Sequence, residues 1–200
     1  MPVAPQPLGR RERNKQAKLE RIIAAAGELF AERGVDEVTT QQIADAADIG
    51  AGTLFLYAKT KGELLLLVQN THYAAALERG RTAASDATNS LDGVMGLVAP
   101  IVACNRVQID NGRTYLREMV FGDPTEPHHA EALSIVAQTE KAIVGILTDL
   151  ARLSAPEAST LARVISAIQF LTMASSEHTD SSIDEIVDAI RTQVAAILPR

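Results

Sequence analysis

Apolar residues recur along this chain at the three- and four-residue spacing that is typical of amphipathic helices. In the segment from residue 14 to residue 33 they form one stripe, made of Ala17, Ile22, Ile23, Ala26, Leu29 and Phe30. Similar stripes cover residues 61–81, 91–110, 129–153, 155–173 and 183–197, and a shorter one lies near residues 115–121. Alternating polar and apolar runs, which predict strands, do not stand out. The pattern predicts an all-α fold of about nine helices.

Local signals predict where several of these helices begin and end. A Ser or Thr followed three residues later by Glu or Gln is the capping box that begins a helix. It occurs four times, at Thr39–Gln42, Thr60–Glu63, Ser154–Glu157 and Ser182–Glu185. Gly34 stands where a left-handed residue ends the first helix, and Gly112 marks a break after the helix of residues 91–110. Pro100 is expected to kink that helix.

The stretch from Thr39 to Lys61 predicts two short helices joined by a tight turn. Ile43, Ala44 and Ala47 share one face of the first helix, and the turn follows at residues 48–50. The second helix is expected over residues 53–57, with Leu54 facing inward. Small alanines allow two helices to cross closely, so the stretch predicts a helix-turn-helix unit, whose second helix reads DNA.

The chain therefore divides into a flexible basic arm (residues 1–13), a helix-turn-helix head (14–60) and a helical body (61–200). The net charge of -6 is unevenly distributed. Residues 1–65 hold nine Lys and Arg against nine Asp and Glu, whereas the remainder holds ten against sixteen. Six cations lie between Arg10 and Arg21. A basic end on an acidic body favours a DNA-binding head with a regulatory body.

Composition sets further bounds on the class of protein. Hydrophobic residues make up 46% of the chain, enough for a sizeable core. The densest apolar run, residues 64–68, is too short to span a membrane, and the N-terminus lacks the apolar core of a secretory signal. The single cysteine, Cys104, excludes an internal disulfide. We expect a soluble cytoplasmic protein without a membrane partner.

With these elements in place, residues 15–67 resemble the DNA-binding domain of the tetracycline-repressor (TetR) family of transcriptional regulators. The matching positions are Leu29, Phe30, Gly34, Thr40, Ile43, Ala44, Ala47, Gly52, Thr53, Leu54, Tyr57, Lys61 and Leu64. The resemblance implies a homodimer that binds double-stranded DNA at a palindromic operator. Most members of the family are repressors, so the resemblance favours repression. A dimer bound over a promoter blocks polymerase without further machinery.

The resemblance and the side-chain chemistry together predict a set of DNA contacts. Lys61 is expected at a phosphate, Gln41 at a base edge, and the Arg10 cluster in a minor groove or along the backbone. The full predicted set is Thr40, Gln41, Gly50, Ala51, Thr53, Phe55, Leu56, Tyr57, Lys61, Arg10, Arg11 and Arg13. Each polar residue alone would also suit a solvated helix face. Their shared spacing favours the DNA interpretation.

Three departures from the family pattern reduce the number of base-reading side chains. Phe55 stands where relatives usually carry tyrosine, Leu56 where the residue is often aromatic, and Ala58 where it is usually large and apolar. The recognition helix begins with Gly50-Ala51-Gly52, which offers no long polar side chain. We therefore expect few direct base contacts and a larger share of backbone and shape readout.

In the resembling family the body dimerises through its last two helices and holds a small-molecule ligand between the earlier ones. The predicted dimer residues are Leu161, Ile165, Ile168, Ile186, Ile190 and Val194. The predicted pocket residues are His72, Met95, Val98, Val102, Asn105, Tyr115, Met119, Phe170 and Met173. Each apolar member is equally a typical core residue. A small-molecule inducer would act by favouring a body whose two heads no longer fit successive major grooves.

Two other classes of function stay open. Cys104 with His72, His128, His129 or His178 could form a nucleophile–base pair, and His128-His129 with Glu126 or Glu131 a metal site, but no spacing brings them together. We therefore predict no enzyme activity, cofactor or metal. The second alternative is a helical dimer whose head binds proteins, which the missing tyrosine at position 55 and the overall acidity would suit.

Overall fold

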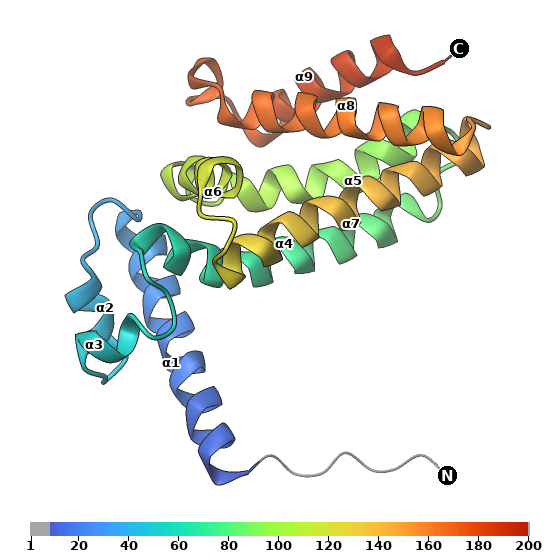
Figure 1. The fold of residues 1–200 in the computed structure, drawn as a ribbon. Helices are drawn as coiled ribbons and strands as arrows, with labels where there is room; N and C mark the ends of the chain where they lie inside the picture. Colours follow the sequence, from blue (N-terminus) through green and yellow to red (C-terminus); the bar gives the residue numbers. More distant parts are fainter. Residues whose placement is uncertain (1–8, 200) are drawn as a thin grey trace, which may run out of the picture.

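The computed structural model describes residues 9–199, and within that range it contains nine α-helices, one 3₁₀ turn and no strand (Figure 1). The head comprises α1 (Arg10–Arg33), α2 (Thr40–Ala46) and α3 (Ala51–Leu54). The body comprises α4 (Lys61–Ala84), α5 (Ser90–Asn105), α6 (Ile109–Phe121), α7 (Pro127–Leu150), α8 (Ala155–Ala174), the turn η1 (Ser176–His178) and α9 (Ile183–Ile197). The prediction of an all-α fold with a helix-turn-helix head is confirmed.

The first helix is longer than predicted. It begins at Arg10, so Arg10, Arg11 and Arg13 lie on its first turn and not in a flexible arm. The backbone N–H of Arg13 donates to Gly9 O at 3.0 Å and closes that turn. Arg, Glu, Lys and Gln are good helix formers, which explains why the helix extends through this charged segment. Residues 1–8 of the predicted arm lie outside the described residues.

The signals predicted for the head are present, but its recognition helix is displaced. Thr39 and Gln42 form the capping box of α2, and Gly34 ends α1 with a φ of 78° that favours glycine. The second helix spans Ala51–Leu54, whereas residues 53–57 were expected. After Leu54 the chain continues as a turn, in which the N–H groups of Leu56 and Tyr57 bond carbonyls three residues back.

Two predictions about the middle of the body are corrected. The helix expected over residues 91–110 ends at Asn105, and Gly112 lies inside α6. The Gln108 side chain accepts a 2.6 Å hydrogen bond from Asn111 N and caps α6, so the break falls at residues 106–108. Gly112 is needed for close approach, because a Cβ there would collide with the backbone carbonyl of Asn105.

Proline and capping residues place the later helices. Helix α7 begins at Pro127, two residues before the predicted start, because proline is tolerated in the first turn of a helix. The capping boxes at Ser154 and Ser182 are both present. The box predicted at Thr60–Glu63 is only half formed. Thr60 caps Glu63 N at 3.0 Å, but the Glu63 carboxylate points to another helix.

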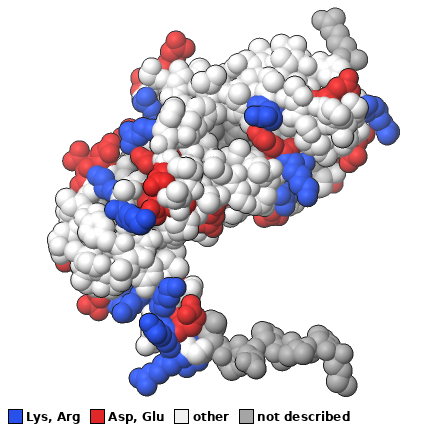
Figure 2. All heavy atoms as spheres, viewed as in Figure 1, with Lys and Arg blue, Asp and Glu red and all other residues white. Residues whose placement is uncertain are grey.

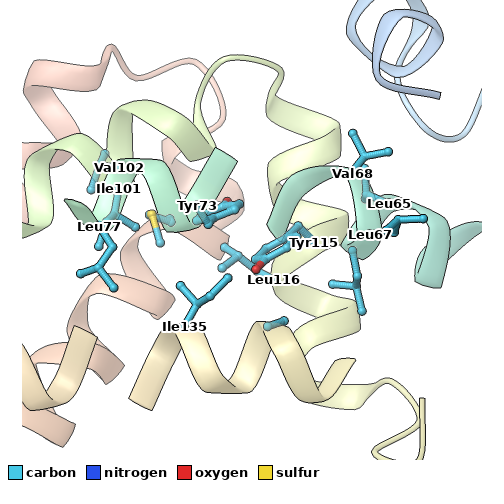
Figure 3. Close-up of a cluster of buried hydrophobic side chains, with 14 of the residues drawn as sticks. Leu65, Leu67, Val68, Tyr73, Leu77, Ile101, Val102, Tyr115, Leu116 and Ile135 are labelled. Atoms are coloured by element: carbon cyan, nitrogen blue, oxygen red, sulfur yellow. The ribbon is translucent and has the colours of Figure 1, made fainter. Parts of the chain in front are cut away.

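Helix α4 connects the head to the body and is covered on several sides (Figure 1). Its run from Leu64 to Val68 is buried throughout, since α1 packs against it from the head and α5, α6 and α7 from the body. Figure 3 shows Tyr73 and Leu77 of α4 close to Ile101 of α5 and Tyr115 of α6. This core holds the body helices around α4, with α8 and α9 on the side farthest from the head.

No single helix among residues 9–199 is long and apolar enough to cross a membrane. Helices α5 and α6 reach that length and composition only as a pair, which is bent by 112°.

Candidate functional site

The outward surface of α2, α3 and the following turn carries most of the predicted DNA contacts. Leu56 is 83% exposed and Phe55 47% exposed, which is unusual for large apolar side chains of a small head. Gln41 and Gly50 are exposed as well, and the half-buried members of the predicted set are Thr40, Ala51, Thr53, Tyr57 and Lys61. An exposed apolar tip next to hydroxyl and amide groups can meet thymine methyls and phosphate oxygens in a major groove.

Three polar side chains of this surface are engaged within the protein. The Gln41 amide donates to the Asp45 carboxylate at 2.7 Å, so a base contact would require it to leave that partner. The Tyr57 hydroxyl donates to Lys15 O of α1 at 3.4 Å and so ties the recognition turn to α1. Lys61 Nζ donates to Asp36 O at 3.1 Å. An ammonium carries three protons, so Lys61 keeps donors for a phosphate.

Basic side chains gather over the N-terminal half of α1 (Figure 2). The exposed cations there are Arg10, Arg11, Arg13, Lys15 and Lys18. Further along α1, Arg21 pairs with Asp48 of the α2–α3 turn at 3.2 Å. The basic half of α1 therefore projects beyond the helix-turn-helix, where its cations can follow a phosphate backbone.

A polar junction joins the head to the first turn of α7. The His128 ring lies 3.0 Å from Tyr57 O, and because a carbonyl only accepts, Nε2 donates. Lys59 Nζ pairs with the Glu126 carboxylate at 2.5 Å, and that carboxylate raises the pKa of Lys59. The carbonyl end of the recognition turn is therefore held by the residues that begin α7.

Glu63 is the buried centre of this junction. Its carboxylate oxygen Oε1 accepts from His128 N at 2.8 Å and from His129 N at 3.3 Å. These are free backbone donors at a helix N-terminus, where a negative charge is also favoured by the helix dipole. Burial raises the pKa of Glu63 above its ordinary value of 4.5, although the two backbone N–H groups act in the opposite direction.

Asn111 makes a second polar link, from the body to the end of α1. Its Oδ1 accepts from Val35 N at 2.7 Å, and its Nδ2 donates to Phe30 O at 2.8 Å. All three residues are buried. One body side chain thus satisfies both backbone groups where α1 ends and turns toward α2.

The body contains an elongated cavity of about 480 Å³. Its long walls are α7 and α8, α6 covers one end, and α4 and α5 supply the floor. The residues that line it are Tyr73, Ile101, Tyr115, Leu116, Met119, Val120, His129, Ala132, Leu133, Ile135, Val136, Thr139, Glu140, Arg163, Ser166, Ala167, Gln169, Phe170 and Met173. Along α7 the lining runs from His129 to Glu140, about 16 Å at the rise of an α-helix.

Only some of the predicted pocket residues line this cavity. Tyr115, Met119, Phe170 and Met173 line the cavity. The others lie elsewhere, because Met95, Val98 and Val102 are fully buried in the helix core, Asn105 donates to Tyr73 Oη at 2.7 Å, and His72 is exposed. Helical periodicity distinguishes buried from exposed positions, but it does not distinguish a cavity wall from a packed core.

His129 was not among the predicted pocket residues, yet it is the most unusual group in the cavity wall. Its side chain is only 4% exposed, and neither ring nitrogen has a hydrogen-bond partner within the described residues. Nothing in the sequence pattern distinguishes His129 from its neighbour His128. Because α7 starts at Pro127, His129 falls on the inward face of the first turn.

The predicted dimer residues also divide. Ile165, Ile186, Ile190 and Val194 are completely buried between α8, α9 and the rest of the body, so they close the core of one chain. An apolar stripe remains on the outer side of α8. It consists of the exposed Val164 and Leu171 together with the half-buried Leu161 and Ile168. The 3-4-3 spacing of these four residues is that of a helix-packing seam.

The chemistry expected of an enzyme does not assemble in the described part of the chain. Burial raises the pKa of the Cys104 thiol to about 11, which is the opposite of nucleophile activation. Between residues 9 and 199, no three His, Cys, Asp or Glu side chains are placed to hold a metal ion.

Residues 22–68 match the family model of bacterial regulatory proteins of the tetR family. Over nearly the whole chain the fold is similar to a TetR transcriptional regulator from Rhodococcus sp. RHA1, with a TM-score of 0.67, 19% identity, and coverage of 92% of this chain and 97% of that one. The chain therefore has a head of the tetR family and a fold of the TetR type. The matched segment runs from α1 into α4, so the TetR-type head includes the first turns of α4.

Two FadR transcriptional regulators are also similar in fold. Thermus thermophilus FadR, a transcriptional repressor in complex with lauroyl-CoA, aligns with a TM-score of 0.69 and 22% identity over 91% of this chain and 96% of that one. Bacillus subtilis FadR, in complex with stearoyl-CoA, aligns with a TM-score of 0.63 and 16% identity over 88% and 96%. No curated protein matches this chain by sequence. The TetR-type fold is that of DNA-binding transcriptional regulators.

Proposed function

We propose that this protein is a repressor of the TetR type, which binds a palindromic operator as a homodimer and leaves it when a small molecule fills the body cavity. The observation that carries the proposal is the surface of α2, α3 and the following turn. It presents the exposed Phe55 and Leu56, and the hydroxyls of Thr40 and Thr53 lie on the same unit. Such a surface suits contact with the major groove better than contact with water.

The basic half of α1 adds the backbone contacts. Arg10, Arg11 and Arg13 occupy one helical segment beyond the helix-turn-helix, so they can follow phosphates next to the groove that α3 enters. The groups at the recognition surface itself are few and short. This supports a large share of shape and backbone readout, with Gln41 as the main base-reading side chain once it leaves Asp45.

The proposed dimer forms through the outer stripe of α8, with the neighbouring end of α9. Leu171 is 65% exposed, Val164 42% and Ile197 37%, although they lie on otherwise well-packed helices. A shallow groove between Leu161, Val164 and Ile197 could receive the same stripe of a second copy. A two-fold axis there pairs like surfaces and presents two heads to one duplex.

The junction at α7 supplies a route from the cavity to the head. His129 lines the cavity, and its backbone N–H shares the Glu63 carboxylate with His128. The His128 ring in turn holds the carbonyl of Tyr57 on the recognition turn. A ligand that shifts the first turn of α7 would therefore shift the recognition surface, and the head spacing would no longer suit the operator. The two FadR proteins of similar fold, which hold acyl-CoA ligands, support a ligand of partly apolar character here.

DNA binding is tested by titrating the full chain with its own upstream DNA across a salt series. The log–log slope should be about -0.9 per phosphate neutralised. Lys61→Ala should weaken all sequences alike and flatten the slope by roughly one unit, whereas Lys141→Ala on α7 should do neither. Salt-independent binding, or none at any candidate promoter, would favour the alternative of a protein-interaction head.

The dimer is tested by light scattering on the purified protein. Leu171→Asp should convert a dimer to a monomer, because it places a charge in the middle of the seam. Val107→Asp is the matched control, since Val107 is 82% exposed on a different surface. A monomeric wild-type protein, or a Leu171→Asp variant that stays dimeric, would contradict this interface.

A further inference from the structure

The two ends of the cavity differ in the burial and charge of the residues that line them. His129 and Met173 lie toward the first end, and Glu140 and Arg163 toward the second, because α7 and α8 run antiparallel along the slot. His129 and Met173 are buried, whereas Arg163 is exposed and Glu140 half-buried. The second end, the rim of the cavity, carries one charge of each sign and so selects weakly. Any sharp selectivity has to arise at the buried end.

Among the polar residues of the cavity wall, Tyr115 and Thr139 are hydrogen-bonded within the chain, whereas no hydrogen bond of the buried His129 and Gln169 side chains is found within residues 9–199. The Tyr115 hydroxyl donates to Asn70 Oδ1 at 2.9 Å, and the Thr139 hydroxyl donates to Ile135 O at 2.9 Å. The His129 ring has no partner at Nδ1 or Nε2 within residues 9–199, although it is almost fully buried. Unpaired buried polar atoms are costly, and in native proteins each one calls for an explanation. His129 also lines the cavity, but neither ring nitrogen is open to it, so a rotation of the side chain is needed to turn one of them toward a ligand.

We infer that His129 recognises an uncharged hydroxyl at the buried end of an elongated, otherwise apolar ligand. A neutral imidazole offers one N–H donor and one acceptor, and a hydroxyl can meet either nitrogen. The walls between His129 and the rim are mostly aliphatic and aromatic, with Thr139, Ser166 and Gln169 among them, so they suit a hydrocarbon chain of roughly a dozen carbons along the 16 Å slot. A polar or charged end of the ligand then stays at the rim. This inference rests on the proposed function, because it names the ligand class of that same cavity.

A pair of probes isolates the hydroxyl. Dodecanoate and ω-hydroxydodecanoate have the same chain and the same carboxylate, and they differ only at the far end. Calorimetric titration of the full-length protein should show the hydroxylated probe binding about tenfold more tightly, the usual gain for a buried hydrogen bond. A wholly apolar pocket would bind dodecanoate more tightly, because burial of the hydroxyl without a partner costs its hydration.

Two variants assign the preference to His129. His129→Phe keeps an aromatic ring of similar size and removes both nitrogens, so it should favour dodecanoate. His129→Gln keeps a donor and an acceptor, and it should retain much of the preference for the hydroxylated probe. Nitrogen chemical shifts of the His129 imidazole should move when ω-hydroxydodecanoate binds and stay nearly unchanged with dodecanoate. If His129 had only a structural role, His129→Phe would leave the preference between the probes unchanged. The nitrogen shifts of the wild-type imidazole would then respond to both probes alike.

The outcomes separate this inference from the proposed function. Equal affinities for the two probes in the wild-type protein, an unchanged preference in His129→Phe, or no binding of either probe would each overturn the inference. DNA release is measured on the same preparation with an operator fragment. If the inference fails but another compound releases the operator DNA, the proposed function still holds. Conversely, a hydroxyl preference through His129 without DNA release would contradict ligand-controlled repression and leave the inference intact.

Discussion

Buried polar side chains at the head–body junction have partners, whereas the buried histidine of the cavity has none. At the junction, Glu63 accepts two backbone N–H bonds and Asn111 binds both backbone groups at the end of α1. In the cavity, both His129 nitrogens lack a partner within the described residues. The fold of one chain thus supplies partners for the junction residues, and it supplies none for the ring nitrogens of His129 within the described residues.

This contrast predicts opposite signs for mutations at the two places. Removing a paired group leaves its partners unsatisfied and destabilises the protein, while replacing an unpaired group by an apolar one of the same shape removes a cost. The following substitutions test that difference.

Asn111→Ala should have the largest effect on stability. It leaves Val35 N and Phe30 O buried without partners, and it opens a small cavity between α1 and α6. We expect a loss of about 3 kcal/mol in the free energy of unfolding, measured by urea denaturation. Asn14→Ala, on the exposed part of α1, is the matched control and should change stability by less than about 0.5 kcal/mol. A comparable loss in both variants would show that Asn111 does not link the head to the body.

Glu63→Gln should cost less, because the amide oxygen still accepts one backbone hydrogen bond and the desolvated charge is removed. We expect a loss of about 1 kcal/mol at neutral pH, with weaker coupling between cavity and head. Its pH dependence is more informative. Burial raises the pKa of Glu63 above 4.5, so in the window just above 4.5 the folded protein holds a proton that the unfolded chain has released.

The contribution of this carboxyl to stability therefore falls as the pH rises through that window. The wild-type protein should gain stability relative to Glu63→Gln as the pH is lowered from 7 toward 5, which urea midpoints of the two proteins can measure. If the difference between the proteins instead shrinks on acidification, the hydrogen bonds from α7 outweigh burial and the direction of the pKa shift is opposite.

His129→Phe should change stability in the other direction. The phenyl ring fills similar space and has no polar atoms to satisfy, so the ligand-free protein should gain about 1 kcal/mol, measured as a higher urea midpoint. His128→Phe is the matched control, because it removes the donor to Tyr57 O and should destabilise the junction. If both substitutions destabilised the protein, His129 would behave like the paired residues of the junction, and the contrast between the two sites would be wrong.

The same contrast shows how far the sequence alone can predict this molecule. The Thr39, Ser154 and Ser182 boxes were correctly predicted because the two partners of each are three residues apart. The box at Thr60 failed in its second half because the carboxylate of Glu63 binds residues far along the chain, at His128 and His129. Local rules predict local pairs, and the junction is built from distant ones.

The body illustrates a second limit. Ile165, Ile186, Ile190 and Val194 form regular apolar stripes, and regularity alone does not say whether a stripe faces its own core or a second chain. The structure turns those residues inward and leaves Leu171 outside. His129 was missed for a related reason: its burial depends on the start of α7 at Pro127, and a shift of two residues moves a side chain to another face of the helix.

Tyr57→Phe should have the smallest effect on stability and tests where the junction ends. The Tyr57 hydroxyl donates to Lys15 O at 3.4 Å, a long bond on a half-buried side chain. Its loss should cost at most about 0.5 kcal/mol in urea denaturation, since the ring still packs against the head. DNA affinity should fall more than stability does if the hydroxyl also reaches a phosphate, because no other group replaces it there. A loss of stability as large as that of Asn111→Ala would extend the tightly paired junction into the recognition turn itself, and the head would then be too rigid to respond to a ligand through α7.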